Sequence, residues 1–116
     1  MAKAIILEPG KEAEVREIGT DWKSLSAIVG GMIECVAPFG NNIVITVNEE
    51  GKILGLPLNR ALVEDGKVLD IYAGTMVVLR ADGEQLVSLT DEQVAFILQR
   101  FGKPESVNVW SEKFSL

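Results

Sequence analysis

Short runs rich in valine and isoleucine, separated by turn-forming residues, occur along most of the chain. The clearest run is "NNIVITVNEEG" at 41–51, and further turns follow in "VEDGKV" at 63–68 and at Asp82-Gly83. Such runs favour β-strands, and glycine can take the left-handed conformation that a hairpin turn needs. We expect a mostly antiparallel sheet in which residues 48–51 form a hairpin turn. Gly74, inside the run "LDIYAGTMVVLRADGE", indicates a bulge or a close approach of backbone.

Two segments carry the spacing of amphipathic helices instead. Residues 20–31 offer Thr20 or Asp21 as an N-cap and Gly30 as the C-terminal stop. Residues 88–104 begin with Thr90 and Gln93, the pattern of a capping box. The predicted apolar faces are Trp22, Leu25, Ile28 and Val29 in the first helix, and Val94, Ile97, Leu98 and Phe101 in the second.

These elements predict an α+β fold. At 116 residues the chain has the length of one domain, which we place at 1–116. We expect the two main helices to pack on one face of the sheet, and the alternating tail at 105–116 to add an edge strand. The consecutive apolar residues 76–79 predict a strand that is covered on both faces. Two helices are too few for that, so we expect a homodimer or a higher homo-oligomer.

The composition excludes several kinds of chemistry. The chain has no histidine, which rules out histidine-based catalytic triads, and its one cysteine, Cys35, cannot form an intrachain disulfide. We expect neither a metal site nor a cofactor, and we expect Cys35 to be a buried small hydrophobe. The net charge of -6 disfavours direct nucleic-acid binding. No membrane span or signal-peptide core is apparent, so we expect a protein of the cytoplasm.

An Asn-Arg pair interrupts the apolar stretch "GKILGLPLNRAL" at 51–62. Pro57 can start a short helical turn at 57–63, which would direct Asn59 and Arg60 away from the core. Arg60 could then pair with Glu64 on the surface. Alternatively, Asn59 and Arg60 could bind a phosphate or carboxylate, because a guanidinium group holds such anions with two hydrogen bonds. In that hypothesis the ligand-binding residues are Asn59, Arg60, Tyr72, Thr75 and Trp22, although the helical spacing of Trp22 favours a core position and Tyr72 equally suits the edge of the core.

The stretches "VGGMIECVAPF", "NEEGKILGLPLNRAL" and "IYAGT" resemble a family of small proteins from bacteriophages, plasmids and their bacterial hosts, catalogued as a domain of unknown function. The resemblance extends from Ala4 to Phe101 and implies a phage or mobile-element setting in the bacterial cytoplasm. It brings no catalytic residues, and the tail lies outside it.

Two functions follow from this setting and these residues. The first is a non-enzymatic binding protein that sequesters a small nucleotide-type immune signal of the host. The second is an acidic protein-interaction factor or DNA mimic that inhibits a host defence enzyme. Acidic residues outnumber basic ones by 17 to 11, but the two signs alternate along the chain, which is typical of an ordinary solvated surface.

Overall fold

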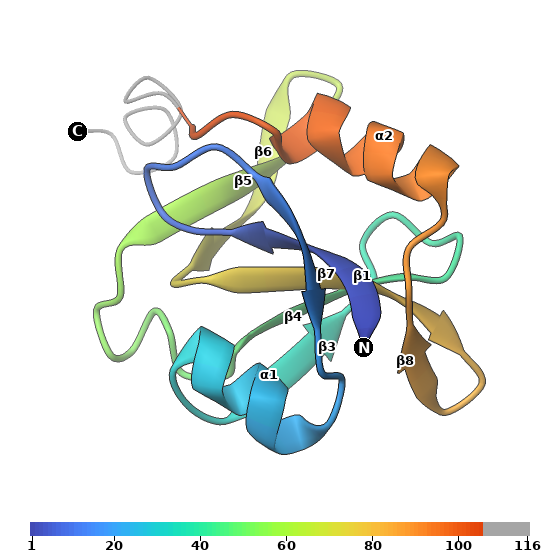
Figure 1. Ribbon diagram of the computed structural model, residues 1–116. Helices are drawn as coiled ribbons and strands as arrows, with labels where there is room; N and C mark the ends of the chain where they lie inside the picture. The colour runs from blue at the N-terminus through green and yellow to red at the C-terminus, as the bar shows by residue number, and fades with distance from the viewer. Residues whose placement is uncertain (106–116) are drawn as a thin grey trace.

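The structure is a computed structural model that describes residues 1–105. Its order of elements confirms the α+β class, with eight strands and two helices in this part of the chain (Figure 1). The elements are β1 (Ala2–Leu7), β2 (Glu14–Ile18), α1 (Trp22–Val29), β3 (Ile33–Val36), β4 (Ile43–Asn48), β5 (Leu58–Glu64), β6 (Lys67–Ala73), β7 (Met76–Asp82), β8 (Gln85–Val87) and α2 (Asp91–Phe101). The predicted strand at 105–116 falls outside the described residues except for Glu105.

The strands form two antiparallel sheets. The larger has the order β2-β1-β7-β4-β3, with β8 paired to the end of β7, and the smaller is the β5–β6 hairpin. Strand β7 lies at the centre of the larger sheet, and its residues 76–79 are fully buried, as the run of four apolar residues predicts. Because consecutive side chains of a strand point to opposite faces, both faces of the sheet must be covered.

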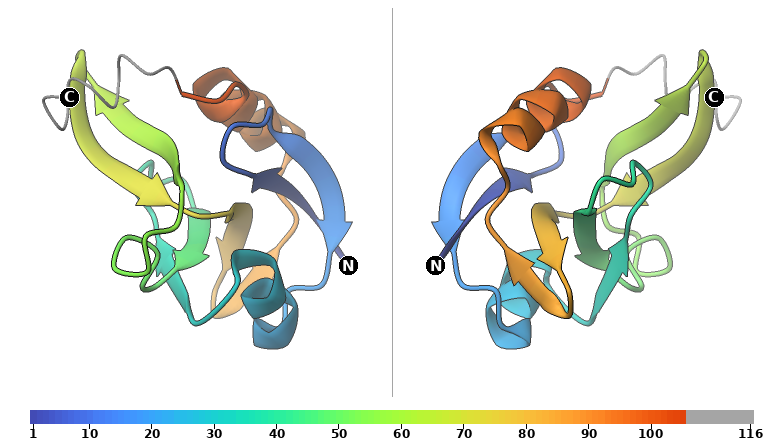
Figure 2. Two further views of the ribbon diagram at one scale, coloured as in Figure 1. Left: turned by 90° about the vertical axis from the view of Figure 1, so that its left-hand side faces the viewer. Right: turned by 90° about the vertical axis from the view of Figure 1, so that its right-hand side faces the viewer.

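The two helices cover opposite faces of the larger sheet, so the expectation that they share one face is wrong. Helix α1 packs Leu25 and Val29 in one apolar cluster with Val77, whereas α2 packs Ile97 in the other cluster with Val78. Figure 2 shows the sheet between the helices, with the β5–β6 hairpin beside α2. The hairpin contributes Leu62 and Tyr72 to that second cluster. It therefore covers part of the sheet face for which we expect a second copy of the chain.

The predicted helical turn at 57–63 is also wrong, because Leu58–Glu64 is strand β5. The turn to β6 contains Asp65 and Gly66, both with positive φ, which suits a two-residue hairpin turn. Residues 48–51 do not form a hairpin, since β4 pairs with β3 and β7 while β5 pairs with β6. They begin the loop that carries the chain from the larger sheet to the hairpin (Figure 1).

Gly74 stands between two strands, and its close neighbour is the side chain of Leu56, whereas we expected a bulge or a close approach of backbone. It has a φ of +81°, and a Cβ atom there would lie 2.8 Å from Leu56 Cδ1. The run that we read as one strand therefore divides into β6, which pairs in the hairpin, and β7, which pairs in the larger sheet. Glycine permits this change of direction because it has no side chain.

The helix ends match the sequence patterns closely. The Asp21 side chain accepts a hydrogen bond from Ser24 N, and Gly30 ends α1 with a φ of 83°. Thr90 and Gln93 form the predicted capping box at the start of α2.

Trp22, in contrast to its predicted place on the apolar face of the first helix, is 67% exposed and takes no part in the core. Within residues 1–105, neither helix has the length and apolar character needed to cross a membrane.

Candidate functional site

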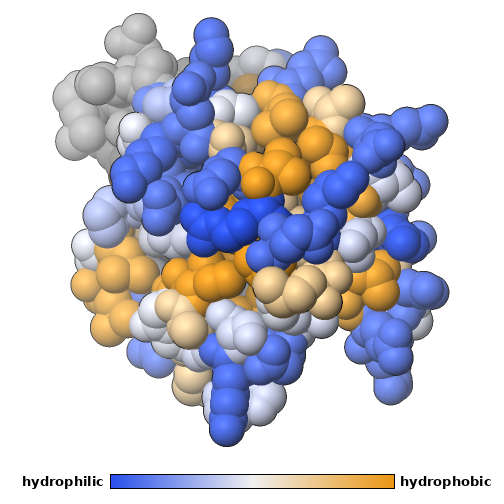
Figure 3. Space-filling model, in the orientation of Figure 1, coloured by the Kyte–Doolittle hydropathy of each residue, from blue (hydrophilic) through white to orange (hydrophobic). Residues whose placement is uncertain are grey.

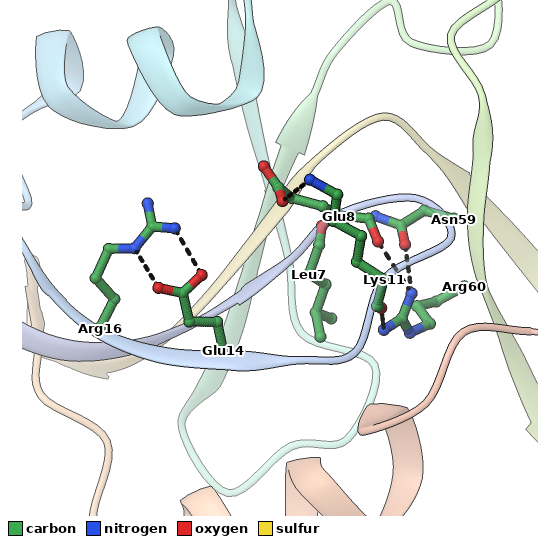
Figure 4. A network of polar contacts seen from close by, with 7 residues as sticks. All are labelled: Leu7, Glu8, Lys11, Glu14, Arg16, Asn59 and Arg60. Atoms are coloured by element: carbon green, nitrogen blue, oxygen red, sulfur yellow. Dashed lines mark hydrogen bonds and ion pairs between the residues drawn. The ribbon is translucent and has the colours of Figure 1, made fainter.

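Arg60 lies in the interior and has no exposed surface. Its guanidinium donates to three backbone carbonyls in two segments: Nε to Phe101 O at 3.0 Å at the end of α2, and Nη2 to Lys11 O at 2.7 Å and Nη1 to Glu8 O at 3.4 Å in the β1–β2 loop. Burial lowers the pKa of Arg60, and the Glu105 carboxylate opposes this shift. Arg60 therefore joins strand β5 to the β1–β2 loop, as Figure 4 shows, and also to the end of α2.

Asn59 completes this arrangement, which we call the Asn59–Arg60 lock. Its Nδ2 donates to Leu7 O at 2.7 Å and its Oδ1 accepts from Arg60 Nη1 at 2.7 Å (Figure 4). The same Nδ2 also donates to Gly74 O at 2.7 Å. A register shift in β5 between Leu58 and Arg60 explains how two consecutive residues can both be buried.

The burial of Asn59 and Arg60 contradicts both hypotheses that directed them away from the core, the Arg60–Glu64 surface pair and the anion site. Their polar groups are used inside the fold, so they do not form an open anion site. Among residues 1–105, no ion pair joins Arg60 to Glu64. Glu64 instead pairs with Arg100, whose Nη2 lies 3.4 Å from Glu64 Oε1. The physical reason is that Leu58–Glu64 forms a strand with a bulge, so helical spacing does not apply.

A pocket of about 270 Å³ opens between β3 and β4 of the larger sheet and β6 of the hairpin. We call it the β3–β6 pocket. Its apolar lining includes Val36, Val47 and Ile53, and its polar lining includes Tyr72 and the amide of Asn48. That amide donates to Val29 O and accepts from Glu50 N, so it is part of the scaffold.

The charges at this pocket are mainly negative. Glu34, Glu49 and Asp70 contribute three carboxylates, and Lys52 contributes one ammonium, which lies 3.0 Å from Asp70 Oδ1. Burial, together with the nearby Asp70 and Glu34 carboxylates, raises the pKa of the Tyr72 hydroxyl above its ordinary value. A positively charged group would lower the electrostatic energy of this arrangement.

The five predicted ligand-binding residues do not form one site. Tyr72 lines the β3–β6 pocket, Asn59 and Arg60 form the lock, and Thr75 is half-buried between β6 and β7. Trp22 borders a separate hollow beside β8, together with Leu25 and Glu84. Of the pocket residues, only Tyr72 was predicted. The alternation of Asp70 and Tyr72 along one strand was the one signal in the sequence that could have indicated a shared face.

No group of three or more cysteine, aspartate or glutamate side chains within residues 1–105 is placed to hold a metal ion. Cys35 is exposed on β3, contrary to the expectation of burial, with Sγ 3.7 Å from Thr46 Oγ1. Strand β3 lies at the edge of its sheet, which explains why a residue in an apolar run stays accessible.

The family model for a domain of unknown function, DUF3846, matches residues 1–102, which include both the lock and the β3–β6 pocket. The chain belongs to the DUF3846 family. This match confirms the resemblance to a family of unknown function and extends over nearly the same residues. No curated protein and no solved structure matches the chain. DUF3846 is a domain of unknown function, so the match assigns no activity to the pocket.

Proposed function

We propose that this DUF3846 protein is a non-enzymatic binding protein whose β3–β6 pocket holds a small, positively charged group with an apolar body. The observation that supports this is the composition of the pocket wall: three carboxylates and a tyrosine hydroxyl surround an apolar lining, and the one ammonium already faces Asp70. A desolvated cation is stabilised by carboxylates at short range, and its apolar part by contact with side chains such as Val36 and Val47.

The size of the pocket narrows the ligand class. Drug-sized ligands occupy pockets of about 300–1,000 Å³, whereas this one measures about 270 Å³. It suits a group of the size of one long side chain. A nucleotide would bring phosphate charges toward Glu34 and Asp70, and Arg60 is not free to bind them. Sequestration of a nucleotide-type signal stays a prediction that the same experiment tests.

The pocket favours the second of the two functions, a protein-interaction factor. In the phage or mobile-element setting that the resemblance implies, the occupant would be a basic group of a host defence protein, held in the bacterial cytoplasm. A DNA mimic has less support, because it needs long rows of negative charge. Five ion pairs among residues 1–105 instead place positive side chains next to negative ones on the surface. On the face shown in Figure 3, apolar patches likewise alternate with polar residues, and one apolar patch lies over the β4–β5 loop.

Tyr72 provides a direct test because it is the one tyrosine of the chain. Its ionisation can be followed by ultraviolet absorbance while benzylguanidinium is added, a probe that stays charged at high pH. We expect the cation to bind and to lower the pKa of Tyr72. Adenosine monophosphate should leave the pKa unchanged, and a rise caused by that nucleotide would instead support nucleotide binding. If benzylguanidinium does not bind at millimolar concentration, the proposal is wrong.

Two matched variants locate the binding. Glu34 and Glu17 are both exposed carboxylates on edge strands of the larger sheet, but only Glu34 lines the pocket. A partly exposed charge pair contributes up to about 1 kcal/mol, so Glu34→Gln should weaken benzylguanidinium binding by about threefold to fivefold. Glu17→Gln should leave the affinity unchanged. Equal affinities in both variants would place the cation elsewhere.

A further inference from the structure

Strand β3 has one open edge beside the β3–β6 pocket. It pairs with β4 from Ile33 to Val36, and within residues 1–105 no strand pairs with its other side. An open edge presents backbone donors and acceptors that a further strand can use. Glu34 and Val36 of the same strand line the pocket, so the open edge and the pocket are continuous.

The hydrogen-bond pattern shows which residues of β3 face the open edge. Glu49 N donates to Met32 O at 2.8 Å, at the position next to the Ile33–Asn48 pair. Backbone groups in an antiparallel ladder alternate between partner and open side. Glu34 and Val36 therefore bond to β4, while Ile33 and Cys35 present their N–H and C=O groups outward.

We propose that a basic peptide segment docks on this edge as an added β-strand and places a lysine or arginine side chain in the β3–β6 pocket, beside Glu34. This inference rests on the proposed function and names the kind of partner. The open edge provides main-chain hydrogen bonds, and the pocket selects side chains on one face of the added strand. Charge complementarity with Glu34, Glu49 and Asp70 favours a basic segment.

A second copy of the chain suits this edge less well. Pairing of β3 with β3 would bring the Glu34 side chains of two copies near one another, and each copy carries a net charge of -6. Strand β3 is also only four residues long. A short strand gives a long-lived homodimer little area, whereas a peptide gains additional contacts by entering the pocket.

Backbone methylation separates strand addition from simple charge attraction. The probe is a seven-residue peptide that alternates lysine and valine, and its affinity is compared with two versions N-methylated along one edge or the other. An N-methyl group prevents hydrogen bonding along the peptide edge that carries it. Only the version that is methylated on the edge facing β3 should therefore bind more weakly. We expect one version to lose at least tenfold in affinity and the other to bind within twofold of the parent. Hydrogen exchange of the Ile33 and Cys35 amides should slow when the parent peptide binds.

Cys35→Pro is the matching change on the protein. The Cys35 N–H points to the open edge, so proline removes a docking donor without removing a hydrogen bond to β4. We expect Cys35→Pro to lose peptide binding and to keep benzylguanidinium binding, while Cys35→Ser keeps both. Hydrogen exchange of the β4 amides checks that β3 stays in place.

The outcomes distinguish the two proposals. If benzylguanidinium binds but both methylated peptides bind equally well, strand docking is wrong and the pocket proposal stands. If neither benzylguanidinium nor the peptide binds, both are wrong. A homodimer in light scattering, with slow exchange at Ile33 and Cys35 before peptide is added, would assign the edge to a second copy and overturn the peptide proposal.

Discussion

Replacing Arg60 by alanine tests whether the Asn59–Arg60 lock stabilises the fold. Removal of the guanidinium leaves Phe101 O and Asn59 Oδ1 buried without this donor. A buried acceptor without a partner costs about 1–3 kcal/mol, and each lost buried methylene about 0.8 kcal/mol. Lys11 O is only partly buried and can turn to water. With two such buried acceptors and two lost methylenes, we expect Arg60→Ala to lower the free energy of unfolding by about 4–8 kcal/mol.

The assay is urea unfolding followed by far-ultraviolet circular dichroism. A loss of this size can approach the whole stability of a small domain, about 5–15 kcal/mol. Arg60→Lys is the second variant, because it keeps the charge and most of the stem but loses the planar set of donors. We expect it to fold with a smaller loss. The control is Arg16→Ala, since Arg16 is exposed and its ion pair within residues 1–105 is the one with Glu14.

The control should leave the free energy of unfolding nearly unchanged, because water screens an exposed ion pair. The reasoning would be refuted if Arg60→Ala also lost less than about 1 kcal/mol, for then the buried acceptors would have found other partners at little cost. A changed denaturant slope in Arg60→Ala alone would indicate that the hairpin separates before the rest of the protein unfolds.

Three further changes test other parts of the structure. Thr90→Ala removes the capping-box acceptor of α2 and should cost about 1 kcal/mol, measured by the same unfolding assay. Gly74→Ala should cost about 1–2 kcal/mol for its positive φ, and more than Gly10→Ala, which has positive φ but no neighbour within 4 Å. Because the pKa of Tyr72 is raised from 10.0 in the folded protein, this residue should favour unfolding as the pH rises above 10, and Tyr72→Phe should remove that part of the pH dependence.

Local chemistry explains what the sequence predicted well. The capping box of Thr90 and Gln93 and the stop at Gly30 each depend on residues within one helical turn. The burial of residues 76–79 follows from four consecutive apolar residues, because a strand with one face in water would alternate apolar and polar residues. These features need no knowledge of distant parts of the chain.

Pairing between distant segments explains what the sequence missed. The run through Gly74 looks continuous, and only the tertiary structure shows that β6 and β7 belong to different sheets. The pocket joins Glu34 of an edge strand to Asp70 and Tyr72 of the hairpin, an association that no local pattern contains. The same holds for Trp22, whose helical spacing matched that of Leu25 while its place at the start of α1 left it exposed.

The lock and the pocket are connected through the hairpin. Arg60 pairs with Tyr72 across the two strands, so the lock that holds β5 to the β1–β2 loop also sets where β6 stands relative to β3. Loss of Arg60 should therefore weaken ligand binding, the result also expected if Arg60 bound the ligand itself. The two causes differ in the protein without ligand: a contact residue leaves its stability unchanged, whereas a residue of the lock lowers it. Arg60→Lys sharpens the distinction, because a partly kept lock should restore stability and benzylguanidinium binding together.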